Sequence, residues 1–545
     1  MRIRPRVGSR RPLLATVTVG FALAAVSLAL VGTRTAGTSP AVSDVPPHSH
    51  SGAGAMFAGV GDFAALSDSQ RRVDDAAPRD PRGRAGSGGA AVVHRAGGRR
   101  GGPSPARSLL HRTGELGYEP SLGLLRDGSV LVTAAKVTNT GARVIWGPMV
   151  LRSRDRGASF QEVSPVVGGQ RAHVISNDPY LYAEPRTGRV FSTNLVGAFC
   201  PQIARSDDGG ATWANNPLTC THVADHQSLF GGPPVSSKPT GYPHVLYYCA
   251  ASLGAQDRAA ASACQKSTDG GSTFVSTRGL PFRPTLMDGP GGNAIYCDGL
   301  LGQGAVGPDG AVYLPKNCRD PLLLVSRDEG DSWETIKIPT SLGVNTDTYG
   351  KPDHESSVAV DAKGVVHLSW VGRDRLPYLV SSRDGGRTWT RPLMVAPPGV
   401  VETNLPALAV TPGGRVAVAY LGSTTSPGRP FPNDSNCAAP TSTGPCGGGK
   451  AYADVTWNGY VTVTDTPLSA DPIFTSASVN APSDPLIVGE CGPFRCQQQY
   501  DFIDVQLDAV GTPWAAFMDG CNSDRKCTLV GETVVGRLSG LRRHS

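Results

Sequence analysis

Ser206-Asp207-Asp208-Gly209-Gly210-Ala211-Thr212-Trp213 is the stretch that decides the fold, because the chain carries this pattern five times. Every copy has Ser, Asp, Gly, then Ser or Thr, and a closing aromatic residue in the same places. The copies occupy 153–160, 206–213, 267–274, 326–333 and 382–389, and their starts lie 53, 61, 59 and 56 residues apart. A motif repeated at a nearly fixed period is typical of a propeller or another array of similar units.

The residue types within each copy predict a hairpin turn. Asp and Ser or Thr side chains bond back to the turn backbone, and Gly permits positive φ. We expect the closing aromatic ring to pack between neighbouring sheets. These turn contacts account for the five aspartates, so we assign no catalytic role to Asp155, Asp208, Asp269, Asp328 and Asp384.

A second periodic element, an apolar strand, a tight turn and another apolar strand, precedes each copy. Clear examples are 122–133 around Asp127-Gly128 and 358–370 around Lys363-Gly364. Seven such units fit into 115–541, at about 61 residues each, which matches the spacing of the motif. The sequence therefore predicts an all-β fold, a seven-bladed β-propeller of four-stranded blades around a central channel.

The repeated motif resembles the Asp box, or BNR repeat, of the sialidase superfamily. The resemblance covers most of 115–541 and makes a six-bladed, sialidase-like ring the alternative blade count. It also implies a Phe-Arg-Ile-Pro-like word before the first copy, but the nearest string, Phe282-Arg283-Pro284, follows the third. Tyr500, beside Asp501 in the last unit, is a loose positional match to the sialidase tyrosine nucleophile. The catalytic signature of a sialidase is therefore largely missing.

The first 112 residues differ from the rest in composition and charge. They hold 16 Arg against 6 Asp, whereas 113–545 hold 35 basic and 39 acidic residues. Arginines before an apolar run at 13–31 are typical of an export signal, so we expect 1–41 to be a cleaved signal or a retained membrane anchor. Residues 42–112, rich in Gly, Arg, Ser and Pro, are predicted to be a disordered linker, leaving 113–545 as the propeller.

These features predict a monomer that is secreted or tethered to the cell surface through its N-terminus. The acidic balance of 113–545 argues against a nucleic-acid partner. All 12 cysteines follow residue 199, and an exported protein would hold them as disulfides. Connectivity cannot be derived from sequence, so chain order alone suggests pairing Cys200 with Cys220, Cys249 with Cys264, Cys297 with Cys318, Cys437 with Cys446, Cys491 with Cys496, and Cys521 with Cys527.

One carboxylate stands just before the first strand of every unit, where we expect the channel mouth. These residues are Glu119, Asp178, Asp225, Asp298, Asp353, Glu402 and Asp501. Converging carboxylates need protons, partners or a bound cation. Because oxygen ligands suit Ca²⁺ or another divalent cation, we predict a metal site from Glu119, Asp178, Asp298, Glu402 and Asp501. The alternative is that these acids cap loops by accepting bonds from backbone amides.

Two units share a histidine-containing word at this position, Asp225-His226-Gln227-Ser228 and Asp353-His354-Glu355-Ser356. His222 and His226 have a zinc-like spacing, but the segment is predicted to be a loop entering a strand rather than a helix. The predicted catalytic residues are Asp225, His226, Asp353, His354, Glu355 and Tyr500. The predicted substrate-binding cations are Arg171, Arg373, Arg375 and Arg495.

The predicted function is that of an exported, carbohydrate-active propeller, a glycosidase-like hydrolase acting on a glycan or glycoconjugate at the channel mouth. Paired carboxylates are the usual means of glycoside hydrolysis. The alternative is a non-catalytic extracellular propeller that binds glycan or protein, because propellers host many unrelated functions.

Overall fold

The computed structural model describes residues 86–139, 144–167, 170–171, 176–196, 200–217, 224–252, 261–282, 301–345, 355–425, 455–488, 501–521 and 527–542. All the described residues belong to one compact unit, Phe63–Ser545. Every regular element among them is a β-strand, as the repeat predicts. The predicted signal or anchor at 1–41 lies outside the described residues.

No helix within the described ranges has the length and hydropathy needed to cross a membrane.

Four of the sheets are antiparallel and have four strands each, paired in chain order. They are β10 (Ser176–Ala183), β11 (Val190–Val196), β12 (Cys200–Ser206) and β13 (Ala214–Pro217); β14 (Ala224–Gly232), β15 (Val245–Ser252), β16 (Ala261–Ser267) and β17 (Val275–Ser276); β18 (Ala305–Val306), β19 (Val312–Asn317), β20 (Pro321–Ser326) and β21 (Glu334–Lys337); and β22 (Ser357–Val360), β23 (Val366–Val371), β24 (Pro377–Ser382) and β25 (Leu393–Met394). Each run of four consecutive strands is therefore one repeating unit.

Two larger sheets contain strands from both ends of the described chain. One has eight strands: β31 (Asp504–Leu507), β32 (Pro513–Cys521), β33 (Cys527–Ser539), β4 (Arg107–Leu124), β5 (Val130–Asn139), β6 (Val144–Ser153), β7 (Gln161–Glu162) and β1 (Gly86–Ser87). The other has seven: β26 (Glu402–Val410), β27 (Val416–Ser423), β28 (Thr456–Thr464), β29 (Ile473–Ser478), β2 (Val92–Arg95), β3 (Arg99–Pro103) and β30 (Ile487–Val488). A separate two-stranded sheet consists of β8 (Val166–Val167) and β9 (Gln170–Arg171).

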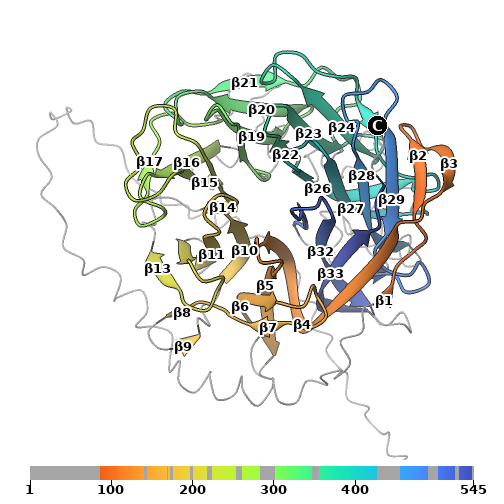
Figure 1. The fold of residues 1–545 in the computed structure, drawn as a ribbon, viewed down its shortest axis with the longest axis horizontal. Helices are drawn as coiled ribbons and strands as arrows, with labels where there is room; N and C mark the ends of the chain where they lie inside the picture. The colour runs from red at the N-terminus through yellow and green to blue at the C-terminus, as the bar shows by residue number, and fades with distance from the viewer. Residues whose placement is uncertain are drawn as a thin grey trace, which may run out of the picture. The chain divides into compact units, whose positions relative to one another are not determined.

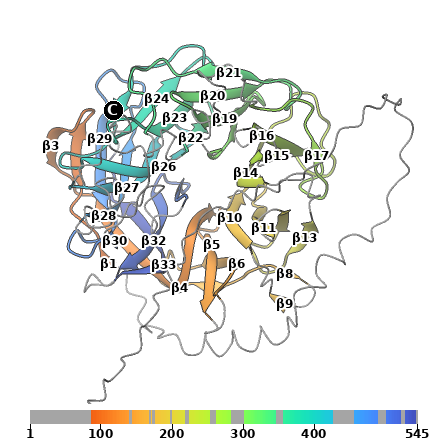
Figure 2. The ribbon, with the colours of Figure 1, turned by 180° about the vertical axis from the view of Figure 1, so that it is seen from behind.

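The long strand β4 connects two sets of strands within the eight-stranded sheet. Its first part pairs with β33, for example Leu110 opposite Gly536, and its second part pairs with β5, with Leu122 opposite Val132. An early strand is thereby hydrogen-bonded to the last one. Within the unit Phe63–Ser545 the sheets follow one another around a ring, with β10, β14 and β26 toward its middle (Figures 1 and 2). This radial repetition of antiparallel sheets is the architecture of a β-propeller.

The hydrophobic core consists of layers between successive sheets. In one layer, Leu131 and Val150 of the first sheet pack with Leu181 and Val190 of the next, and Trp213 covers them. Trp213 is the closing aromatic of its repeat, and its indole N–H donates to the main-chain oxygen of Val163 at 2.7 Å. The predicted packing of the closing aromatic between sheets is therefore confirmed for this copy.

The turn contacts predicted from the repeat are confirmed in all five copies. In 206–213, the N–H of Gly210 donates to Ser206 Oγ at 2.8 Å, and Thr212 donates to Asp208 through its N–H at 2.8 Å and its hydroxyl at 2.6 Å. The Thr212 bonds lower the pKa of Asp208 to about 2. Gly210 has a φ of 93°, which glycine adopts without strain. The aspartates thus act in the turns.

Residues 86–112 correct the predicted boundary of the linker, because they form β1, β2, β3 and the first part of β4. β2 pairs with β29, and the buried His94 shares a hydrogen bond with Ser476 Oγ at 2.7 Å. Arg95 and Arg99 lie on the exposed side and both pair with Asp471. Two of the arginines that suggested a solvated linker, Arg95 and Arg99, thus belong to the outer side of an added hairpin.

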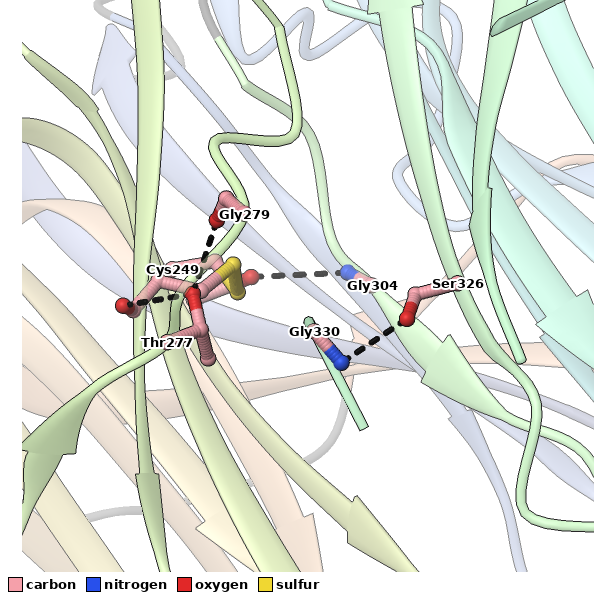
Figure 3. Close-up of a disulfide and its surroundings, with 8 residues drawn as sticks. Cys249, Thr277, Gly279, Gly304, Ser326 and Gly330 are labelled. Carbon is pink, nitrogen blue, oxygen red and sulfur yellow. Dashed lines mark hydrogen bonds between the residues drawn. A yellow bond between two sulfur atoms is a disulfide. The ribbon is translucent and has the colours of Figure 1, made fainter. Parts of the chain in front are cut away.

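One predicted disulfide, between Cys249 and Cys264, is confirmed. The two cysteines are opposite each other in β15 and β16 and are buried. Figure 3 shows Cys249 near Thr277, whose hydroxyl contacts the main-chain oxygens of Cys264 and Gly279. This disulfide therefore joins two neighbouring strands inside one blade.

The other five predicted disulfides each include a cysteine whose side chain is not among the described ones. Cys318 and Cys521 are disulfide-bonded, but the side chains of their predicted partners, Cys297 and Cys527, are not among the described ones. The cysteines that lie outside the described residues are Cys220, Cys297, Cys437, Cys446, Cys491 and Cys496, and the side chains of Cys200 and Cys527 lie outside them too. These five pairings therefore stay predictions.

Candidate functional site

Four inner strands contain the same irregularity near the middle of the ring. The ladder shifts register between Tyr118 and Ser121 in β4, Asn177 and Tyr180 in β10, Asp225 and Ser228 in β14, and Asn404 and Ala407 in β26. One residue in each shift has positive φ: Glu119 (54°), Asp178 (51°), His226 (47°) and Leu405 (54°). Bulges of this kind redirect side chains and are frequent beside functional sites.

The residue after each left-handed position is proline in three of the four bulges, Pro120, Pro179 and Pro406. Proline has no backbone N–H, so it leaves no ladder donor unpaired where the register shifts. In β14 the corresponding residue is Gln227. The sequence predicts a carboxylate just before the first strand of every unit, and two of these acids, Glu119 and Asp178, do occupy bulges. In β14 and β26, however, the bulge residues are His226 and Leu405.

A cavity lies where these inner strands converge, and it encloses about 480 Å³ including the space open to solvent. It is lined by Tyr180, 226–228, 301–303, 355–357, 405–407 and 501–503. Each of these segments comes from a different one of six successive repeating units. The cavity is therefore built jointly by six units of the ring. Ligand sites are commonly concave, mostly apolar pockets with a few converging polar groups.

His226 joins two carboxylates in this cavity. Its Nδ1 lies 2.5 Å from Glu355 Oε1, and its Nε2 lies 2.9 Å from Asp501 Oδ2. The side chains of His226, Glu355 and Asp501 are 1%, 11% and 23% exposed, so the buried ring supports two acids that are progressively more open to solvent. The ring of His226 also meets that of Phe502 in a T-shaped arrangement, at 5.9 Å between centroids.

The hydrogen-bond pattern limits where the protons are in this trio. An ionised carboxylate only accepts hydrogen bonds, whereas a neutral imidazole donates from one nitrogen and accepts at the other. Two contacts to carboxyl groups therefore require either a doubly protonated ring or a proton on one carboxyl. Both arrangements give Glu355 or Asp501 a partner with which it can exchange a proton, as acid–base chemistry requires.

A second buried acid, Asp504, ties strands together next to the cavity. Its Oδ2 accepts from the N–H of Leu122 at 2.7 Å and from Ser121 Oγ at 3.0 Å, and its carboxylate also takes a bond from Gln303. Burial raises the pKa of Asp504 to about 6, against the lowering effect of these bonds. Sequence reasoning missed Asp504, although an acid inside an apolar strand of a repeat unit was a signal of a buried polar contact.

The structure brings His226 and Glu355 of the predicted catalytic set together, with Asp501 from the predicted metal set as their third member. Asp225 pairs through its backbone with Ala251. The remaining predicted catalytic residues, Asp353, His354 and Tyr500, lie outside the described residues, as do Asp298, Arg495 and the side chains of Asp225 and Arg171.

Two of the predicted substrate-binding arginines contact protein groups away from the residues that line the cavity. Arg375 Nη1 lies 3.5 Å from Glu402 Oε2, and that carboxylate is buried. The guanidinium of Arg373 lies against Gly343, leaving no room for a Cβ there. Neither arginine is among the described residues that line the cavity, so a substrate contact for them stays a prediction.

The predicted metal ligands are also engaged with protein groups where they are described. Asp178 accepts from the N–H of His226 at 3.3 Å, which matches the alternative that these acids bond backbone amides. Glu402 pairs with Arg375, and Asp501 contacts the ring of His226. Across the described ranges, no group of three His, Cys, Asp or Glu side chains has the arrangement of a metal site. A divalent cation stays a prediction.

Comparison with known proteins gives partial similarities. No protein-family model matches the chain. A xyloglucanase from Paenibacillus sp. is 28% identical over 269 residues, which are 44% of this chain and 23% of that protein. The chain therefore matches less than a quarter of the length of that relative.

Among solved structures, the α-L-arabinanase of Penicillium chrysogenum complexed with arabinobiose is 16% identical, with 62% of this chain and 94% of that chain covered and a TM-score of 0.36. The intramolecular trans-sialidase of Ruminococcus gnavus is 13% identical, with 77% and 94% covered and a TM-score of 0.34. Both TM-scores are below 0.5.

Proposed function

We propose that this protein is a glycoside hydrolase whose active site is the cavity around His226, Glu355 and Asp501. One observation carries the proposal: a buried imidazole holds one carboxylate at each of its nitrogens, in a cavity open to solvent. Hydrolysis of a glycosidic bond requires two carboxyl groups in different roles, one that gives a proton and one that takes a proton or attacks. A carboxylate pair joined through one imidazole is suited to that division of roles.

Glu355, the less exposed of the two acids, is assigned the role of proton donor. As the bond between the anomeric carbon and the leaving oxygen breaks, this oxygen takes the Glu355 proton. Asp501, which is closer to solvent, takes the proton of a water molecule whose oxygen bonds to the anomeric carbon. His226 contacts both carboxyl groups, so it can return the proton from Asp501 to Glu355 after the products leave.

The wider architecture is part of the same proposal. We infer seven blades, in which β31–β33 and the first part of β4 form the last blade, and the second part of β4 with β5–β7 forms the first. The five repeats are assigned as Asp boxes on their turn hydrogen bonds. The partial similarity to a xyloglucanase supports a polysaccharide or oligosaccharide substrate. The disulfide between Cys249 and Cys264 supports export from the cytoplasm.

The test is hydrolysis of a panel of aryl glycosides and oligosaccharides by the full-length protein, with and without a chelator. We expect turnover of at least one glycoside, and a loss of about 10²–10⁴-fold in Glu355→Gln and Asp501→Asn. Asp471→Asn, which removes an acid that lies just before β29 and pairs with Arg95 of the outer hairpin, is the matched control and should retain full activity. A panel without turnover, or variants as active as the wild type, would refute the proposal and favour a binding propeller.

A further inference from the structure

The bulges of β10 and β14 contact each other directly, and these strands are neighbours in the ring (Figures 1 and 2). The N–H of His226 donates to Asp178 Oδ2 at 3.3 Å, and the Gln227 side-chain amide donates to the main-chain oxygen of Asp178. Asp178 and His226 are both buried, at 6% and 3% exposure. One residue of β10 thus receives a backbone and a side-chain hydrogen bond from consecutive residues of the β14 bulge.

The β14 bulge differs from the other three in what restrains its backbone. His226 has a φ of 47°, a conformation that non-glycine residues keep only where the surrounding structure holds them in it. In β4, β10 and β26 the next residue is proline, whose ring fixes its own φ. Gln227 supplies no such restraint. The β14 bulge therefore lacks the proline that stiffens the other three, and it is contacted from outside its own strand by Asp178.

The ring of His226 has little freedom to move without losing its partners. Its two nitrogens contact acids from two different repeating units, Glu355 at 2.5 Å and Asp501 at 2.9 Å. A change of φ at His226 would swing the ring away from the one position in which it makes both contacts. Groups that act in catalysis must be held within about half an ångström of their working positions.

We propose that Asp178 is a positioning residue, which holds the β14 bulge so that His226 bridges Glu355 and Asp501. Its carboxylate fixes the backbone of His226, and its main-chain oxygen fixes the side chain of Gln227. The consequence for activity rests on the proposed function, whereas the consequence for the orientation of His226 does not. Sequence reasoning assigned Asp178 to a metal site, and the bulge gives it a different role.

The experiment compares Asp178→Ala, which removes the acceptor, with Asp178→Asn, which keeps an acceptor oxygen and loses the charge. The measurements are the ¹⁵N signals of the His226 ring, assigned with a His226→Gln variant, and kcat and KM for the best glycoside of the panel. In Asp178→Ala we expect shifted ring signals and a kcat lower by about tenfold or more, with KM within about threefold. Asp178→Asn should restore kcat to within about threefold of the wild type, and Asp471→Asn should change neither measurement.

The outcomes separate this proposal from the proposed function. Unchanged His226 signals in Asp178→Ala would overturn the positioning role, whatever the kinetics show. An asparagine variant as impaired as the alanine variant would also overturn it, because the carboxamide oxygen can accept the same N–H. If the wild type hydrolyses no glycoside, the proposed function fails while the ring signals still decide the role of Asp178. Asp178→Ser, whose hydroxyl is too short to reach His226, serves the same test if the alanine variant does not fold.

Discussion

Glu329 provides a demanding test of how neighbouring sheets are held together. It lies inside the repeat 326–333, and its fully buried carboxylate reaches the connection between β14 and β15. Oε1 accepts from the N–H groups of Val235, Ser236 and Ser237 at 2.8, 2.9 and 2.9 Å. Oε2 accepts from the Ser237 hydroxyl and from Lys266 at 3.3 Å. One side chain thus satisfies three consecutive backbone donors.

We expect Glu329→Ala to lower the free energy of unfolding by about 2–3 kcal/mol at pH 7. The three lost backbone hydrogen bonds, at about 1 kcal/mol each, give the upper value, and solvent near the turn reduces it. The expected measurement is urea unfolding of the wild type and the variant. Glu334→Ala, which removes an exposed glutamate of β21, is the matched control and should change the free energy by less than about 0.5 kcal/mol.

The pH dependence makes this prediction sharper. Hydrogen bonds from Ser237, Ser236 and Val235 outweigh burial and lower the pKa of Glu329 from 4.5 to about 2. Because the folded state releases this proton more readily, the stabilisation is complete above about pH 4.5 and disappears as the pH falls toward 2. The difference between wild type and Glu329→Ala should shrink over that window. A difference that is absent at pH 7, or constant from pH 6 to pH 3, would refute the reasoning.

Two further predictions concern stability. Replacing both Cys249 and Cys264 by serine opens a loop of 15 residues, so unfolding should become easier by about 3 kcal/mol in chemical denaturation, and an unchanged midpoint would contradict this contribution. Burial lowers the pKa of His367 from 6.5 to about 4, against a weaker raising effect of Asp361. The unfolded chain therefore binds a proton that the folded chain excludes, and stability should fall by up to about 3 kcal/mol between pH 6.5 and pH 4. His367→Gln should remove this part of the pH dependence, and identical slopes for both proteins would show that His367 does not supply it.

The strands and turns could be predicted because their signals are local. Each repeat contains its own turn donors, acceptors and glycines, so 206–213 forms its turn from nearby residues alone. The β2–β3 hairpin was missed because its stability depends on β29 and on Asp471, far along the chain. An arginine-rich segment with few apolar residues gives no local indication that such partners exist.

The candidate site was predicted in part, for a related reason. His226 and Glu355 were picked out because the words around them recur at the start of inner strands. Asp501 was assigned to a metal instead, because sequence periodicity gives the level of a residue along the channel and not which side chains meet across it. The bulge in β14 decides that geometry, since His226 takes its left-handed position and lines the cavity. Backbone conformation of that kind follows from contacts between blades.

The most direct measurement is a crystal structure of Glu355→Gln soaked with an oligosaccharide that the wild type hydrolyses. The variant keeps the shape of the cavity while removing the proposed proton donor, so substrate should accumulate. We predict a sugar ring in the cavity lined by His226, Asp501 and Phe502, with its glycosidic oxygen within hydrogen-bond distance of residue 355. Sugar bound elsewhere on the protein, with this cavity left to water, would contradict the account.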